Sequence, residues 1–464
     1  MRAGVVRSII KRQCLTSSSY GARISPVGCC TASSTMGASS NGIDVVVVLG
    51  STGVGKSQLA VDIARKYNGE VISADAMQVY KRLDIITNKV TEEEMCGVPH
   101  HLLDFLDPLK EFTVVDFRNR ALPILERLRA SGKLAVIVGG TNYYIESLIW
   151  ETLAAGYKPT EITEVDALAA NEPTVCSRDE STESLYEKLQ QVDPDRAQML
   201  HPKDRRKIER SLNVFYRQNV RASEIFSDQR RRGGVSGGPL RLKNTVMFWI
   251  QCDQTVLNER LDARVDKMIK QGLIKELLDF HADYNARRGE NCDYTQGIFQ
   301  SIGFKEFHPY LIASEEERQS KQGQQLFESS LWLMKQVTKR YSKYQKKWIT
   351  KRLLGEPERE VPPIYGLDGS DLTVWNERVR DTALGILDEL MEGREPTAKP
   401  LDRVDVHKSD GGLFTCDLCS VTCVGNITWN AHLKSKKHRF NVEVEELCAK
   451  SRQSAVASGD QLTS

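Results

Sequence analysis

The sequence predicts an α/β fold: a doubly wound parallel sheet with a helical insertion and a small additional unit near the C-terminus. Three observations support this prediction. An apolar, β-branched run at 43–49 is followed at once by a glycine-rich turn and a helix-like pattern. Further strand-like runs alternate with helical patterns, which is the order expected of a parallel sheet. Two cysteines and two histidines within 416–438 have the spacing of a metal site.

The core elements can be justified in chain order. A helix is expected at 57–67, because apolar residues recur there at four-residue spacing and Gly69 follows as a stop signal. Another helix begins at Thr113, whose spacing to Asp116 is that of a capping box. Ligands of such a sheet bind at the carboxyl ends of its strands. Strands are predicted where apolar and β-branched residues run together, at 43–49, 70–74, 134–138 and 245–252.

The 464 residues suffice for about three folded units. The stretch 151–240 is first acidic and then basic, with helical patterns, and it separates two parts of the sheet. We expect this division: a presequence or disordered segment at 1–41, the first part of the core at 42–150, a helical insertion at 151–240, the second part of the core with basic helices at 241–355, a linker at 356–412, a zinc finger at 413–440 and a disordered tail at 441–464.

The composition is that of an ordinary globular protein. There are 64 Lys and Arg residues against 62 Asp and Glu, a net charge of +2, and 40% of the residues are hydrophobic. The longest strongly apolar run, Val45–Leu49, is far shorter than the ~20 residues that a membrane helix needs, so no membrane association is expected. Eleven cysteines at mostly irregular intervals favour a reducing compartment over a disulfide framework.

The first 43 residues carry basic and hydroxyl side chains but no acid, and the first carboxylate is Asp44. This composition is typical of a mitochondrial presequence, and a disordered tail is the alternative. We therefore expect a mitochondrial protein. A form that starts at Met36 would lack the presequence and would reside in the cytoplasm or nucleus.

The strongest local motif is GSTGVGKS at 50–57, a P-loop pattern between a strand and a helix. The backbone N–H groups of such a loop, together with the helix N-terminus, bind phosphate oxygens. Lys56 adds a positive charge at the terminal phosphates, and Ser57 can ligate Mg²⁺. The motif does not say which phosphate compound binds. The predicted diphosphate-binding residues are Thr52, Gly53, Val54, Gly55, Lys56 and Ser57.

Two further segments lie where strands end. Asp75 follows the second strand, where a carboxylate can act as a general base, ligate Mg²⁺ or simply cap a turn. The segment GGTNYY at 139–144 follows the third strand and brings the Thr141 hydroxyl and backbone amides to the same edge of the sheet.

The C-terminal motif is Cys416-x2-Cys419-x12-His432-x5-His438. Two thiolates and two imidazoles at this spacing close a tetrahedral Zn²⁺ site that leaves no position open for chemistry. A unit of about 30 residues has too small a core to fold without the metal. The basic segment 433–439 indicates a nucleic-acid partner.

A second basic stretch, 335–352, holds eight Lys and Arg residues and no acid. Lys339, Lys343 and Lys347 recur at four-residue spacing and so share one helical face. The aromatic side chains of this stretch either stack on bases or anchor the helix to the core, and the sequence leaves both readings open for Tyr341, Tyr344 and Trp348.

Taken together, the motifs resemble the tRNA dimethylallyltransferases. The blocks that carry the resemblance run in the family's order across 50–348: GSTGVGKS, SADAMQVY, DIITNKVT, VPHHLLD, GGTNYY, DRRKIERSL, RLDARVDKMI, QSIGFKEF and TKRYSKYQKKW. The finger resembles the one in the eukaryotic branch. The resemblance implies transfer of a dimethylallyl group from its diphosphate to N6 of the adenosine immediately 3′ of the anticodon, tRNA position 37.

The resemblance also implies roles for individual residues. Asp75 accepts the N6 proton, Thr141 hydrogen-bonds the bridging oxygen, and Arg264 binds the diphosphate alongside Mg²⁺. The enzyme then needs no ATP, and we expect it to be a monomer. Contacts to the tRNA anticodon arm are implied for Asp75, Ala76, Met77 and Gln78, and for Arg206, Lys207, Ile208, Glu209 and Arg210.

Two positions depart from the family pattern. Ala76 replaces the usual Ser, and Tyr344 replaces the usual Arg or Lys. Two other functions are also weighed. A P-loop nucleotide kinase or NTPase would consume nucleotide and would usually carry an Arg-rich lid. A non-catalytic RNA-binding protein would lack catalytic side chains, whereas this chain has all five that the chemistry requires: Lys56, Ser57, Asp75, Thr141 and Arg264.

Overall fold

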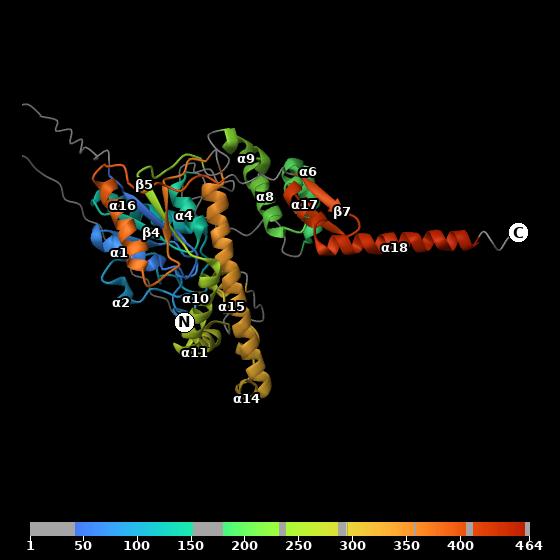
Figure 1. Cartoon of the computed structure of the whole chain (residues 1–464), viewed down its shortest axis with the longest axis horizontal. Helices are drawn as coiled ribbons and strands as arrows, with labels where there is room; N and C mark the ends of the chain where they lie inside the picture. The colour runs from blue at the N-terminus through green and yellow to red at the C-terminus, as the bar shows by residue number, and fades with distance from the viewer. Residues whose placement is uncertain are drawn as a thin grey trace, which may run out of the picture. The chain divides into compact units, whose positions relative to one another are not determined.

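The computed structural model describes residues 42–151, 180–231, 238–285, 294, 296–356, 359–404 and 412–459 (Figure 1). The expected presequence at 1–41 therefore lies outside the described residues. None of the helices in these ranges combines the length and apolar character that crossing a membrane requires.

A six-stranded sheet forms the centre of the core. All its strands are parallel, in the order β3-β2-β4-β1-β5-β6. The central strand β1 pairs with β4 and β5, so that Val45 lies opposite both Ala135 and Thr245. The predicted doubly wound parallel sheet is confirmed. The strands span Val45–Gly50 (β1), Glu70–Ser73 (β2), His100–His101 (β3), Ala135–Val138 (β4), Thr245–Gln251 (β5) and Ile364–Asp368 (β6).

Helices cover both faces of the sheet, which is why the central strands are apolar on both sides. Alternate side chains of β1 point to opposite faces. Val46 and Val48 belong to one apolar cluster, with α1 (Lys56–Lys66), α10 (Gln254–Lys270) and α16 (Thr382–Met391). Val45 and Val47 belong to the other, with α3 (Val114–Ala130), α4 (Asn142–Ile149) and the end of α15 (Lys321–Ile349).

The neighbouring strands β1 and β4 lead into helices on opposite faces, because α1 packs in the first cluster and α4 in the second. Their carboxyl ends therefore form a topological switch point, where open α/β sheets bind ligands. The capping box predicted at Thr113 is confirmed at the start of α3.

A helical layer packs beside the sheet around a third apolar cluster rich in phenylalanine, which includes Phe280, Phe299, Phe304 and Phe307. Its short elements surround α10 and α15. They are α11 (Leu273–Phe280), η1 (His281–Asn285), η2 (Gly297–Gln300), α13 (His308–Leu311) and α14 (Glu315–Gln319). Three other short elements lie elsewhere: α2 (Glu92–Met95) contacts α1, η3 (Thr350–Leu354) continues α15 into the second cluster, and η4 (Asn376–Asp381) packs with α16 and β6 in the first.

The described part of the insertion is helical and has its own apolar cluster, built on Leu185, Leu189 and Leu212. Its helices are α6 (Thr182–Val192), α7 (Pro194–Gln198), α8 (Arg205–Gln218) and α9 (Ala222–Arg231). The C-terminal unit pairs two antiparallel strands, followed by two helices: β7 (Leu413–Cys416), β8 (Val421–Val424), α17 (Asn426–Leu433) and α18 (Lys436–Gly459).

Two expectations are wrong. The predicted linker at 356–412 contains β6, which extends the sheet, and α16, which buries Ile386 and Leu387 against the core. The apolar runs of this segment are too short to be recognised as a strand and a helix from the sequence alone. The predicted disordered tail at 441–464 continues α18 as far as Gly459. Residues 441–459 include three Glu and three Ala, which have high helix propensity.

Candidate functional site

A cavity of about 300 Å³ opens at the carboxyl ends of the strands, at the switch point of the sheet. Segments far apart in the sequence line it: the P-loop, the end of β2, the turn after β4, and side chains from α10 and α15. Eight of the predicted site residues meet in this cleft, namely Thr52, Gly53, Gly55, Lys56, Ser57, Asp75, Gln78 and Arg264.

The P-loop follows β1 directly and depends on two glycines with positive φ, Gly53 at 87° and Gly55 at 90°. A Cβ on Gly53 would also come within 2.8 Å of the Leu261 side chain, so the loop packs tightly against α10. Val54 is 2% exposed within the core. Its side chain therefore fixes the loop, and only its backbone is suited to contact a phosphate.

Two cations share the cleft. The ammonium of Lys56 donates a hydrogen bond to the Ser51 carbonyl at 2.9 Å. Burial lowers the pKa of Lys56 to about 8, opposed by the charge of Asp75 and assisted by that of Arg264. Burial also lowers the pKa of Arg264 to about 10. The Arg264 Nε atom is buried and has no partner within the described residues. Poorly hydrated cations of this kind favour an anionic ligand.

Asp75 and Thr141 come together because the turns after β2 and β4 pack backbone to backbone. A Cβ on Gly139 would lie 2.1 Å from the Ala74 carbonyl oxygen, so only glycine fits. The Thr141 amide donates to that same oxygen at 3.1 Å. The Thr141 hydroxyl accepts a hydrogen bond from the Ala76 amide at 3.0 Å.

The two oxygens of the Asp75 carboxylate have different surroundings. Oδ1 accepts from the Met77 amide at 2.9 Å, which is the turn-capping role that the sequence allowed. Oδ2 lies near Gly140, 3.0 Å from where a Cβ would stand on that residue. Asp75 therefore both caps its turn and contributes a carboxylate oxygen to the cleft.

Helix α15 joins the two sides of the cleft through Gln345, which is 2% exposed. Its Oε1 accepts from the Thr52 amide of the P-loop at 2.8 Å. Its Nε2 donates to the Gly140 carbonyl at 2.9 Å, and the Tyr341 hydroxyl donates to the same oxygen at 3.2 Å. The Thr52 amide is thus committed to the protein. Sequence reasoning noticed the block that contains Gln345 but gave this residue no role.

The structure separates the two readings of the basic stretch. Trp348 anchors α15, because its Nε1 donates to the buried Glu146 at 2.6 Å, and Tyr341 is anchored at Gly140. Lys339 pairs with Asp262 at 2.9 Å. Lys343 and Lys347 are exposed, and Tyr344 is 55% exposed. Fewer basic and aromatic side chains of this helix therefore face solvent than the sequence indicates.

The remaining predicted tRNA contacts also include both exposed and buried side chains. Arg206, Lys207 and Arg210 are exposed on α8, where Lys207 pairs with Asp204 at 2.6 Å. Glu209 is half-buried and pairs with Arg205 at 2.7 Å. Ile208 is fully buried in the core of the insertion, so the prediction that it contacts tRNA is wrong for its side chain. Ala76 and Met77 are half-buried and pack against apolar clusters of the core.

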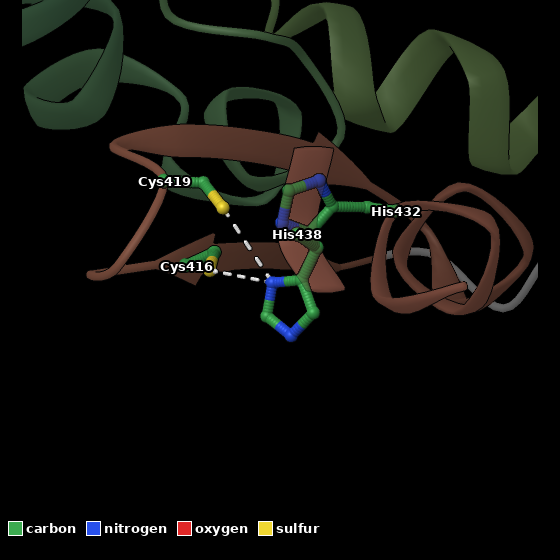
Figure 2. A group of neighbouring side chains, drawn as sticks. All are labelled: Cys416, Cys419, His432 and His438. Carbon is green, nitrogen blue, oxygen red and sulfur yellow. Dashed lines mark hydrogen bonds between the residues drawn. The ribbon is translucent and has the colours of Figure 1, made fainter. Parts of the chain in front are cut away.

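The C-terminal unit brings its four predicted ligands together (Figure 2). Their ligand atoms all lie within 4.8 Å of one another. The Sγ atoms of Cys416 and Cys419 each lie 3.5 Å from His438 Nδ1. His432 Nε2 is buried and has no partner among the described residues. Tetrahedral Zn²⁺ with bonds of about 2.0–2.3 Å fits this donor set. Cys423 is buried outside the cluster, as expected.

The comparisons with known proteins agree with this geometry. A family model described as IPP transferase matches residues 78–352, and a model of a C2H2-type zinc-finger matches residues 414–438. Curated proteins named tRNA dimethylallyltransferase include that of Homo sapiens, which is 45% identical over 403 residues, or 85% of either chain. The protein of the same name from Saccharomyces cerevisiae is 32% identical over 428 residues, which are 86% of this chain and 92% of that one.

A solved structure of a eukaryotic dimethylallyltransferase acting on tRNA superposes with a TM-score of 0.71 at 30% identity. The match covers 88% of this chain and 98% of that structure, so it includes the sheet and the cleft.

The pKa of Lys56 predicts how diphosphate binding depends on pH. Lys56 loses its proton above about pH 8 in the free protein, and a bound anion favours the protonated form. The affinity for inorganic diphosphate should therefore fall as pH rises through 8, by roughly tenfold one unit above the pKa. Calorimetric titration from pH 7 to 9 measures this change. The Lys56→Met variant should lack this step, and identical pH profiles for both proteins would contradict the prediction.

Gln345→Leu should weaken diphosphate binding by roughly tenfold or more, because the Thr52 amide is left without its partner. The Gly140 carbonyl would also lose one of its two hydrogen-bond donors and keep only the Tyr341 hydroxyl. Tyr344→Leu, a change at the exposed neighbouring position, is the matched control and should bind normally. Titration with inorganic diphosphate checks both variants, after circular dichroism has shown that each is folded. Normal binding by a folded Gln345→Leu protein would contradict the expected role of the amide.

Proposed function

We propose a function from the premise that the chain belongs to the IPP transferase family, whose curated members are tRNA dimethylallyltransferases. The protein is an enzyme that transfers a dimethylallyl group from dimethylallyl diphosphate to N6 of adenosine 37 in tRNA, immediately 3′ of the anticodon. One observation carries the proposal: a single cleft holds a P-loop and two cations together with the carboxylate of Asp75.

The diphosphate side of the cleft supports departure of the leaving group. Negative charge develops on the diphosphate as the allylic C–O bond breaks, and preorganised cations and donors stabilise that charge. Lys56 and Arg264 supply the cations, and the P-loop amides supply donors. The Thr141 hydroxyl already accepts from the Ala76 amide, and it can donate its own proton to the bridging oxygen.

The Asp75 carboxylate supports attack by the adenine amine. The N6 amine of adenine is a weak nucleophile, and its nitrogen must lose a proton as the C–N bond forms. The Asp75 carboxylate lies in the cleft to accept that proton. The adenine cannot reach the cleft while it is stacked, so it is flipped out of the anticodon loop.

Magnesium fits the same place. Ser57 and Asp75 both line the cleft, and Mg²⁺ prefers hard oxygen ligands such as hydroxyl and carboxylate groups. Ser57 would hold the ion together with diphosphate oxygens, and the ion would neutralise charge on the leaving diphosphate.

The tRNA partner is supported by exposed basic side chains on separate elements. These are Arg206 and Lys207 on α8, Lys343 and Lys347 on α15, and the basic segment 433–439 beside the zinc ligands. Tyr344 lies beside Lys343 on α15, and its exposed ring is suited to stack on a base. The monomeric state, the mitochondrial location and the cytoplasmic or nuclear form starting at Met36 belong to the same proposal and rest on the sequence.

The Asp75→Asn variant tests the base. Its side-chain oxygen can still accept from the Met77 amide, but it cannot take the N6 proton, so kcat should fall by ~10²–10⁴-fold. The KM for dimethylallyl diphosphate should not rise. The assay follows radiolabel from dimethylallyl diphosphate into unmodified tRNA with Mg²⁺ and without ATP. Labelling at the wild-type rate would contradict the role of Asp75, and ATP hydrolysis without labelling by the wild-type protein would overturn the proposed function.

Removal of residues 413–464 tests the finger. If the finger adds affinity for the tRNA body, the truncated protein should show a higher KM for tRNA at an almost unchanged kcat. The KM for dimethylallyl diphosphate serves as the internal control and should stay the same. A large loss of kcat at saturating tRNA would show that the finger instead supports the catalytic core.

A further inference from the structure

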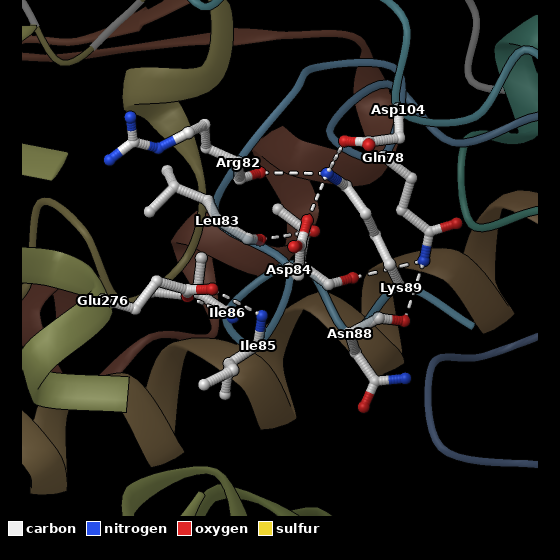
Figure 3. Close-up of polar contacts among 11 residues, drawn as sticks. Gln78, Arg82, Leu83, Asp84, Ile85, Ile86, Asn88, Lys89, Asp104 and Glu276 are labelled. Atoms are coloured by element: carbon white, nitrogen blue, oxygen red, sulfur yellow. Dashed lines mark hydrogen bonds and ion pairs between the residues drawn. The ribbon is translucent and has the colours of Figure 1, made fainter. Parts of the chain in front are cut away.

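Lys89 and its neighbours form a closed cluster of polar groups (Figure 3). The Lys89 side chain is 6% exposed, and its ammonium pairs with the carboxylates of Asp84 and Asp104. It also donates to the Arg82 carbonyl at 2.9 Å. An ammonium has three protons, so these partners use all of them and leave no donor for a ligand. The zinc-ligand cluster is different, because one of its nitrogens is left without a partner.

His438 faces the two cysteine sulfurs with Nδ1 (Figure 2). This nitrogen lies 3.5 Å from the Sγ atoms of both Cys416 and Cys419. Zn–S bonds of about 2.3 Å and a Zn–N bond of about 2.0–2.1 Å, at a tetrahedral angle, place sulfur and nitrogen about 3.5–3.6 Å apart. The observed spacing is therefore that of a ligand that binds through Nδ1. Nε2 lies on the far side of the ring and points away from both sulfurs.

The other histidine offers its other nitrogen. His432 Nε2 is buried and has no partner among the described residues. A buried polar atom in this condition needs an explanation, and a metal ligand is one that fits its place in the cluster. The His432 ring stacks on Trp429, with centroids 5.8 Å apart and planes at 28°, which fixes its orientation. The two imidazoles therefore present different nitrogens to one site.

Hydrogen bonds hold the start of α18 close to the cysteines. The Asn441 amide donates to Cys419 Sγ at 3.2 Å and to the Leu418 carbonyl at 3.3 Å. The His438 backbone amide donates to the Ser435 hydroxyl at 3.2 Å. Ligation through Nε2 would need the His438 backbone to lie farther from the metal, and these bonds oppose that movement. The choice of Nδ1 is thus built into the first turn of the helix.

Ligation through Nδ1 leaves an outward donor. A neutral imidazole that binds metal through one nitrogen carries its proton on the other, so His438 Nε2 is an N–H group. Such groups almost always donate to a carboxylate, a carbonyl or water. The His438 ring is half-buried, and no protein group within the described residues accepts a hydrogen bond from its Nε2. The acceptor must therefore come from outside this part of the chain.

The surroundings favour an anionic acceptor. Two thiolates balance the charge of a Zn²⁺ ion, so the site itself leaves the neighbouring cations uncompensated. Residues 425–442 contain no acid. Cations in the first turn of a helix are unfavourable beside the positive end of its dipole, and an anion would offset that cost. The exposed cations on either side of His438 are Lys434, Lys436, Lys437 and Arg439.

We propose that His438 binds zinc through Nδ1 and donates its Nε2–H to a phosphate oxygen of tRNA. The choice of tRNA as the partner rests on the proposed function, whereas the choice of nitrogen does not. One side chain then serves as both metal ligand and RNA contact. The contact is a hydrogen bond to the backbone, so it adds affinity for tRNA without reading a base.

Nuclear magnetic resonance on the whole zinc-loaded chain, labelled with ¹⁵N in histidine, tests the choice of nitrogen. Long-range ¹H–¹⁵N correlations show which nitrogen of each ring carries the proton, and the signals lost in His438→Cys identify that residue. His438 should have a protonated Nε2, and His432 a protonated Nδ1. A His438 ring protonated at Nδ1 would overturn the inference. Unmodified tRNA should shift the Nε2–H signal and slow its exchange with water, and a signal that tRNA leaves unchanged would overturn the phosphate contact.

Two matched variants measure the affinity. His438→Cys and His432→Cys each give a three-cysteine, one-histidine ligand set and the same change in charge, but only the first loses the outward N–H. With zinc content and circular dichroism checked, the Kd for tRNA of His438→Cys should exceed that of His432→Cys by about tenfold. Equal Kd values for the two zinc-loaded variants would overturn the contact. The wild-type spectra decide the inference even if a variant loses zinc. Failure of the proposed function is distinct, because it would appear as absence of dimethylallyl transfer to tRNA by the wild-type protein.

Discussion

The site depends on one buried amide. Gln345 accepts a hydrogen bond from the P-loop and donates one to the turn that positions Thr141, although these two turns lie almost 90 residues apart in the chain. A buried amide left unsatisfied on either side would cost free energy, so both turns are held in one register relative to α15. The long helix thereby sets the separation between the P-loop and the turn that carries Thr141.

Desolvation of two cations makes the cleft favourable for an anionic ligand. Lys56 and Arg264 lose water on burial, and each is partly compensated by the charge of Asp75. An incoming diphosphate would restore the missing negative charge and would leave Asp75 to interact with the amine. The same carboxylate thus balances the buried cations, and in the proposed mechanism it is the group that accepts the N6 proton.

Local patterns in the sequence were sufficient for the parts of the site that depend on neighbours in the chain. The P-loop, the capping box at Thr113 and the four zinc ligands each lie within a short segment, so their spacing alone fixes their geometry. The alternation of strands and helices was enough for the parallel sheet. The error at 356–412 arose because β6 and α16 are short and become recognisable only through the sheet edge and the helical face that they cover.

The sequence by itself determined the chemistry present: a phosphate loop, a carboxylate, a hydroxyl and a soft-ligand metal site. Residue type and short-range spacing carry that information directly. Only the tertiary structure decided which basic and aromatic side chains face solvent and which are committed to partners, as it did for Lys339, Trp348 and Ile208. It also assigned Gln345 its role, because its two hydrogen bonds reach residues 293 and 205 positions away in the chain, and no local pattern encodes such pairs.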